Sequence, residues 1–85
     1  MAQWTVYEVR AIDREGECFD VYSHDTLREA REDFGSVLRD PECAAVALEK
    51  VTRFDVAGKE WRYTLLDAAG DPAALHAWRT GEVPE

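Results

Sequence analysis

Hydrophobic and polar residues alternate along residues 4–12 and 18–23, which is the pattern of β-strands with one buried face. Between these segments, residues 13–16 read Asp-Arg-Glu-Gly. Aspartate is typical of the first position of a type I turn, and glycine of the left-handed position that follows the turn. The sequence therefore predicts a β-hairpin in which Asp13 lies opposite Glu17.

The predicted pairing determines which side chains share a face of this hairpin. It places Ala11 opposite Phe19 and Val9 opposite Val21, because side chains alternate between the two faces of a strand. Five hydrophobic residues then share one face, which we predict to be buried: Tyr7, Val9, Ala11, Phe19 and Val21.

Residues 26–39 are predicted to form the main helix, because their hydrophobic residues recur every three or four positions. Thr26 and Glu29 have the spacing of a capping box, and Pro41 stops the helix soon after residue 39. Gly35 costs the helix about 1 kcal/mol relative to alanine, which packing must offset. The hydrophobic residues with helical spacing are Leu27, Ala30, Phe34, Val37 and Leu38.

A second hairpin is predicted from residues 44–54 and 60–66, which flank the sequence Asp-Val-Ala-Gly at residues 55–58. Pairing Asp55 with Lys59 sets the register of its two strands. The face that we predict to lie toward the core consists of Glu49, Val51, Arg53, Trp61, Tyr63 and Leu65.

A short C-terminal helix is predicted over residues 72–79, since Asp71 suits the N-cap and Pro72 the first helical position. Residues 82–85 show no periodicity and are predicted to fray. The order of elements is therefore ββαββα. We expect one small α+β domain over residues 1–85, in which an antiparallel sheet of two hairpins packs on the main helix.

The balance of charged residues shows that this domain is strongly acidic. Eighteen Asp and Glu residues outnumber ten Lys and Arg residues, which gives a net charge of −8 and an isoelectric point near 4.6. Because nucleic acid phosphates are negative too, direct nucleic-acid binding is disfavoured and a basic protein partner is favoured. The sequence shows neither a signal-peptide pattern nor an apolar run long enough to span a membrane, so we expect a cytoplasmic protein without membrane contact.

Residues that carry enzyme chemistry are not grouped in this sequence. It contains no nucleophile–base motif, glycine-rich phosphate loop or zinc-ligand spacing, so we expect no catalytic residues, no metal and no cofactor. His24 near Asp20 and Asp25 leaves a small enzyme or ligand-binding domain as an alternative. Cys18 and Cys43 are expected to be reduced, with a single disulfide between them as the alternative.

The carboxylates of the main helix are the leading candidates for a binding surface. Most of them fall along one edge of the helix and its arginines favour the other edge. Like charges three or four positions apart disfavour an isolated helix. For the helix alone the pattern still favours an ordinary solvated face, and it is the net charge of −8 that favours an acidic surface in contact with a basic partner. The predicted contact residues are Glu29, Glu32, Asp33 and Asp40, with Asp13, Glu15 and Glu17 of the first turn as secondary candidates.

Several hydrophobic residues fall outside the predicted core faces. One long helix covers only one face of a sheet, so these side chains either contact the terminal helix or remain available to a partner or a second copy of the chain. Aromatic side chains are typical anchors of such interfaces. The predicted anchors are Trp4, Val6, Tyr22 and Phe54.

In its size, its acidity and its lack of enzyme motifs, the chain resembles the small inhibitors made by phages and mobile elements, among them anti-CRISPR proteins. This resemblance is to a class of proteins and involves no shared motif. It implies a non-enzymatic nucleic-acid mimic that blocks a basic nucleic-acid-binding site on a larger protein complex. The alternative is a small structural or regulatory homodimer that associates through its sheet.

Overall fold

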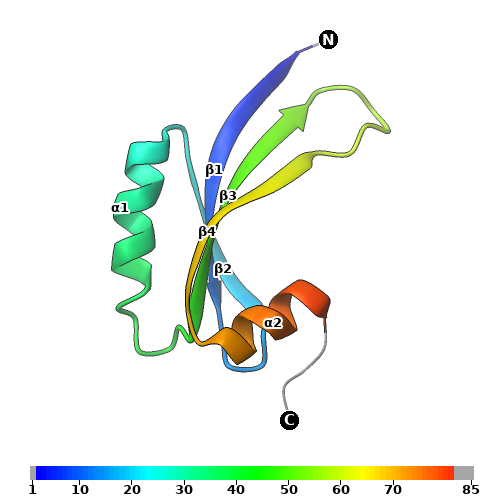
Figure 1. Ribbon diagram of the computed structural model, residues 1–85. Helices are drawn as coiled ribbons and strands as arrows, with labels where there is room; N and C mark the ends of the chain where they lie inside the picture. The colour runs from blue at the N-terminus through cyan, green and yellow to red at the C-terminus, as the bar shows by residue number, and fades with distance from the viewer. Residues whose placement is uncertain (1, 82–85) are drawn as a thin grey trace.

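The computed structural model describes residues 2–81 and has an α+β fold with the predicted order ββαββα (Figure 1). The predicted fold class is thus confirmed, whereas the predicted fraying of residues 82–85 lies outside the described residues. Within residues 2–81, no helix is long and apolar enough to cross a lipid bilayer. The elements are β1 (Gln3–Ile12), β2 (Cys18–His24), α1 (Leu27–Val37), β3 (Ala45–Phe54), β4 (Arg62–Gly70) and α2 (Pro72–Thr80).

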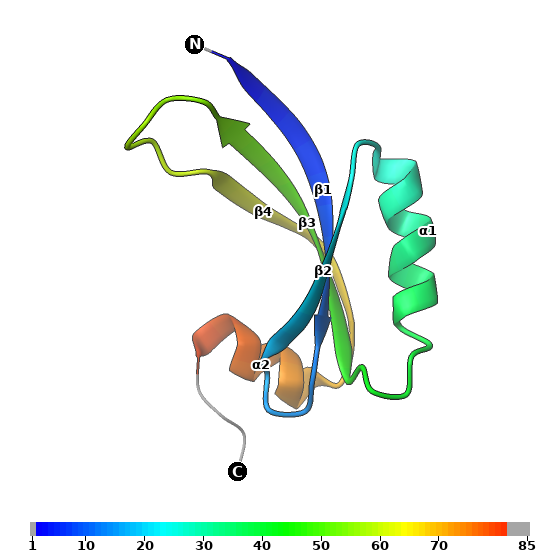
Figure 2. The same ribbon diagram turned by 180° about the vertical axis from the view of Figure 1, so that it is seen from behind.

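The four strands form one antiparallel sheet in the order β2-β1-β3-β4. The two hairpins are therefore joined by a central pairing of β1 with β3, which runs without interruption from Ile12 opposite Ala45 to Gln3 opposite Phe54. The helices α1 and α2 lie on opposite sides of this sheet (Figures 1 and 2). Each face of the sheet consequently has its own, partial helical cover.

The helix α1 covers the face of the sheet that carries Val9 and Leu48. It begins as predicted, because the Thr26 side chain accepts a hydrogen bond from the Glu29 amide at 3.2 Å. Ala30 is fully buried against the two strand residues. Removal of this apolar cluster from water, at roughly 25 cal/mol per Å², holds α1 on the sheet.

The helix α2 covers only the part of the opposite face that lies next to the β1–β2 turn (Figure 1). Asp71 caps the helix as predicted, since its carboxylate accepts a backbone hydrogen bond at 3.0 Å. Ala74 packs in a buried cluster with Ile12. Gly16 of the turn lies so close to α2 that an added Cβ atom would be 2.4 Å from the Cβ of Ala77.

The first hairpin departs from the predicted register. Its turn forms as expected, with Gly16 at a φ of 83°. Beyond the turn a β-bulge shifts the pairing, so that Ala11 lies opposite Asp20 instead of Phe19. Phe19 and Val21 are consequently exposed, and the prediction that they belong to the buried face is wrong.

The second hairpin has the predicted register, with Val51 opposite Tyr63 and Glu49 opposite Leu65. Its predicted core face, however, lies on the side of the sheet opposite α1, because Val51 pairs with Val6 in β1. The expectation that this face is the core is therefore wrong for its exposed members. These are Trp61, Tyr63 and Leu65.

Candidate functional site

The carboxylates predicted to form a ridge on α1 differ in their surroundings. Glu32 pairs with Arg28 at 3.7 Å, but both side chains are largely exposed, and such pairs contribute little in water. Asp33 lies 2.7 Å from the Nε2 atom of His24. Glu29 has no ion pair within the described part of the chain, and Asp40 lies beyond the end of α1. Of the carboxylates on the helix, only Asp33 therefore has a partner in a partly buried site, whereas Glu29 and Glu32 are exposed to water.

A second group of carboxylates gathers between α1 and the edge strand β2. The β-bulge places Asp20, Tyr22 and His24 on the α1 side of the sheet. The Tyr22 hydroxyl donates a hydrogen bond to Asp20 at 2.8 Å, and this bond, followed by partial burial and the charges of Asp20, Asp33 and Asp40, raises the pKa of Tyr22. Carboxylates from a strand, a helix and a loop thus contribute negative potential at the Tyr22 side chain. We call Asp20, Asp33 and Asp40 the acidic side.

Further unpaired carboxylates lie next to the acidic side, at the end of the sheet that carries the β1–β2 turn. Asp13 accepts hydrogen bonds from the amides of Glu15 and Glu17 at 3.0 and 2.9 Å, which orders the turn. The Asp40 carboxylate accepts one from the Glu42 amide at 2.9 Å. Asp13 and Glu42 also line one shallow hollow. None of these five side chains forms an ion pair within residues 2–81, so this end extends the negative potential.

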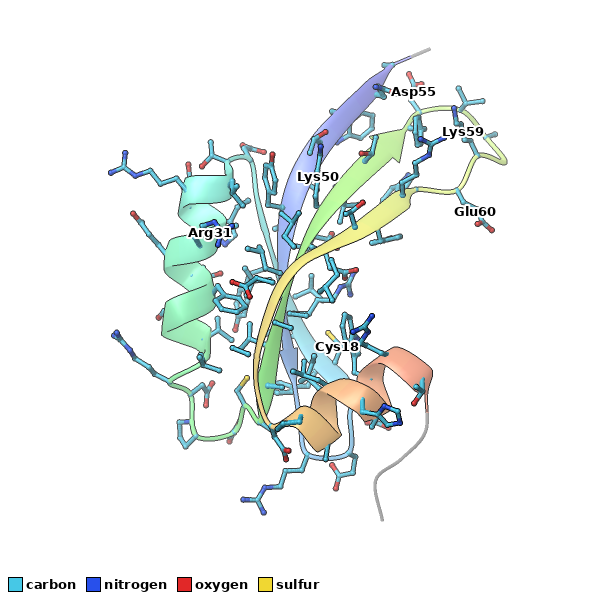
Figure 3. All side chains as sticks on the ribbon, in the orientation of Figure 1. Cys18, Arg31, Lys50, Asp55, Lys59 and Glu60 are labelled. Atoms are coloured by element: carbon cyan, nitrogen blue, oxygen red, sulfur yellow. The ribbon has the colours of Figure 1, made fainter. Side chains whose placement is uncertain are left out.

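The pKa of Tyr22 responds to the hydrogen bond to Asp20 and to the charges of the acidic side together. The double variant Asp20→Asn/Asp40→Asn is expected to lower the pKa of Tyr22 toward its ordinary value, because it removes the carboxylate that accepts the Tyr22 hydrogen bond and two of the three negative charges. Asp55→Asn/Glu60→Gln is the matched control, since both residues lie at the β3–β4 hairpin (Figure 3). Tyrosine ring resonances followed by NMR during a pH titration give the pKa. An equal shift in both variants would contradict a local effect.

His24 has a defined partner in the structure. Its Nε2 atom contacts Asp33 rather than Asp20 or Asp25, the neighbours considered for an acid–base pair. Both cysteines are free thiols, so no disulfide joins them. In the part of the chain that the structure describes, no three His, Cys, Asp or Glu residues are grouped so that they could hold a metal ion.

The face of the sheet opposite α1 is uncovered toward the β3–β4 hairpin (Figure 1). Hydrophobic side chains from β1, β2, β4 and the residue before β4 are 36 to 51% exposed there. We call this surface the open face. Its residues are Trp4, Val21, Trp61, Tyr63 and Leu65.

A network of four charged side chains lies on the same side of the sheet. Glu8 and Glu49 are directly opposite on β1 and β3, and both are buried. Glu8 accepts hydrogen bonds from Arg10 at 2.8 Å and from Arg53 at 3.0 Å, while Arg10 also donates to Glu49. Burial lowers the pKa of Arg10, but the hydrogen bond to Glu49 and the charges of both glutamates outweigh burial and raise it. The four charges cancel.

Two aromatic rings of the open face cover this network. The guanidinium carbon of Arg53 lies 4.6 Å from the ring centre of Trp61, and that of Arg10 lies 5.6 Å from Tyr63. Each such contact contributes about 0.5–1 kcal/mol at a partly exposed site. The two arginine side chains remain 20 and 25% exposed beside these rings. Sequence reasoning placed Glu49 and Arg53 with both rings but missed the network, because the pairing of β1 with β3 is not encoded locally.

The four predicted anchors are divided between the two faces. Trp4 and Val6 lie on the side of the open face, whereas Tyr22 and Phe54 lie on the α1 side. Val6 is only 6% exposed and Phe54 only 7%, so the expectation that these two are available to a partner is wrong. The Phe54 ring is covered by the Lys59 ammonium, 4.1 Å from its centre. Trp4 and Tyr22 are exposed.

No protein-family model matches the chain, and comparisons with curated proteins and with solved structures find no significant match either. A functional interpretation therefore depends on the acidic side and the open face.

Proposed function

We propose that this protein is a non-enzymatic binding module whose acidic side docks on a basic surface of a larger protein. The observation that carries the proposal is geometric: the Tyr22 hydroxyl on β2 donates to Asp20, and His24 on the same strand lies 2.7 Å from Asp33 on α1. Asp40 follows in the loop after that helix. Carboxylates held by three different elements produce one region of negative potential on a folded scaffold. Such a region accelerates association with a basic partner, and dissolved salt screens it.

In the form that we propose, the partner is a cytoplasmic complex that handles nucleic acids, and the module inhibits it by occupying a site for phosphates. The net charge of −8 supports this choice, because basic phosphate-binding sites attract polyanions. The unpaired carboxylates near the β1–β2 turn widen the negative region beyond a single contact. Small inhibitors from phages and mobile elements, including anti-CRISPR proteins, use this principle when they mimic nucleic acid.

Affinity capture followed by competition tests the proposal. Tagged protein captures partners from cells at low salt, and the purified partner is then titrated with the protein at rising salt and with double-stranded DNA. We expect the affinity to fall by about tenfold or more between low and high salt, and DNA to displace the protein. A complex that is insensitive to salt and binds DNA at the same time would contradict the proposal.

A matched pair of double variants locates the contact surface. Asp20→Asn/Asp40→Asn should weaken binding by about tenfold, because it neutralises two charges of the acidic side. Asp55→Asn/Glu60→Gln removes the same charge from the β3–β4 hairpin, away from the acidic side, and should weaken binding less than about twofold. Equal losses would show that net charge, and not the acidic side, determines the affinity. Thermal unfolding of both variants verifies their folds.

A further inference from the structure

The open face has no occupant among residues 2–81, although its side chains are of the kind that interfaces bury. An aromatic side chain buries about 150–250 Å² in full, so the three half-exposed rings, with Val21 and Leu65, leave roughly 500 Å² of apolar surface in water. The largest apolar patch on a monomeric protein is typically about 300–600 Å² and often has a function in binding. The open face therefore has the size and composition of an interaction surface.

Charge decides which kind of partner the open face accepts. Glu8 and Glu49 already accept hydrogen bonds from arginines, so they offer little to a basic protein. A nucleic acid strand stacks on aromatic rings but also needs cations for its phosphates. Arg10 and Arg53 are both held by Glu8 and do not supply them. These constraints favour a neutral, aromatic partner.

We propose that the open face is the interface of a homodimer, in which a second copy of the chain packs on it sheet to sheet. The charges of the two glutamates and two arginines on this face sum to zero. The net charge of −8 is therefore carried by the rest of the molecule. This face is thus where two acidic molecules approach with least repulsion. In a two-fold dimer the rings of each copy pack on those of the other, with the sheets about 10 Å apart.

The shape of the monomer is consistent with a missing layer. Its radius of gyration is 13.4 Å, whereas a compact chain of this length has about 12 Å. The helix α2 covers the sheet only next to the β1–β2 turn, and the strands beyond it carry no helix on that side (Figures 1 and 2). Domains are normally built from packed layers, so a second copy would complete the layer that the monomer lacks.

The area of the open face sets the expected strength of the dimer. Roughly 500 Å² for each copy is below the approximately 800 Å² that each partner buries in a standard interface. We therefore expect a reversible dimer with a micromolar dissociation constant. The acidic side lies on the α1 side of the sheet and remains exposed in such a dimer. This proposal consequently does not depend on the proposed function.

Sedimentation velocity over low to several hundred micromolar protein tests the dimer. We expect monomer at the low end and dimer at the high end, with tryptophan emission shifting to shorter wavelength as Trp4 and Trp61 leave water. Tyr63→Lys should raise the dissociation constant by about tenfold or more, because it replaces an aromatic anchor of the open face by a charge in both copies. Phe19→Lys alters an aromatic residue that is 44% exposed and lines the hollow with Asp13 and Glu42, and it should leave the dissociation constant unchanged.

Two results would overturn the proposal: a monomer at every concentration of the unmodified protein, or equal weakening by both lysine variants. Circular dichroism establishes that both variants are folded, and the measurement on the unmodified protein requires no substitution. Asp20→Asn/Asp40→Asn should dimerise at least as well as the unmodified protein. If the protein does not dimerise, the proposed role of the acidic side is unaffected. If the acidic side does not bind a basic partner, the proposed dimer is unaffected.

Discussion

Gly16→Ala is expected to lower the free energy of unfolding by about 2–5 kcal/mol, the sum of left-handed backbone strain and overpacking. At a φ of 83°, any residue with a Cβ atom is strained. The new methyl group would also lie 2.4 Å from the Cβ of Ala77 and 2.8 Å from the Trp78 amide nitrogen, so α2 must move away from the turn. Denaturant unfolding followed by circular dichroism measures the loss.

Gly58→Ala is the matched control for this prediction. Gly58 has nearly the same φ, 84°, but no atom lies within 4 Å of the position that its Cβ would take. Only the backbone strain remains, so the expected loss is about 1–2 kcal/mol. The difference between the two variants isolates the contact between the turn and α2. Equal losses of unfolding free energy would mean that the contact between the turn and α2 is not tight enough to exclude a methyl group.

Glu8→Ala is expected to destabilise the fold by about 2–3 kcal/mol, because Arg10 and Arg53 both lose an acceptor in a partly buried site. The full cost of breaking a buried ion pair is about 3–5 kcal/mol, but both arginine side chains are 20 to 25% exposed, so water offsets part of it. Glu60→Ala, at an exposed position, should change stability by less than about 0.5 kcal/mol. Urea titrations of both variants measure the difference.

A loss for Glu8→Ala no larger than that of Glu60→Ala would contradict a stabilising network. Glu8→Ala also tests the proposed dimer interface on the open face. Arg10 and Arg53 would no longer be neutralised by Glu8, and the two copies of a dimer would face each other with net positive charge. The dimer is therefore expected to weaken along with the fold.

Features decided by local chemistry were predictable from the sequence. Gly16 suits a left-handed turn position wherever the turn lies, and Thr26 and Asp71 cap helices through hydrogen bonds to nearby amides. The register of the second hairpin follows from its turn in the same way. These predictions are confirmed because each depends on residues fewer than twenty positions apart.

Features decided by distant contacts were not predictable. The pairing of Val6 with Val51 determines which face of the second hairpin meets α1, and nothing near either residue specifies it. The bulge at Phe19 was missed although it lies within a local hairpin, because the turn sequence does not specify it. It brings Tyr22 and His24 to the side of α1, where His24 contacts Asp33. The acidic side includes two residues predicted from the helix, Asp33 and Asp40, but Asp20 joins them only through this bulge.

The central pairing of β1 with β3 also determines the order in which the chain can fold. The paired residues are far apart in the sequence: Ile12 and Ala45 are separated by 33 positions, and Gln3 and Phe54 by 51. Contacts over such separations carry a large loop-closure entropy, and topologies that depend on them fold slowly. During synthesis, Val9 lacks its cross-strand neighbour Leu48 until β3 has left the ribosome. We therefore expect the first ββα segment not to be stable by itself, and folding to follow translation of most of the chain.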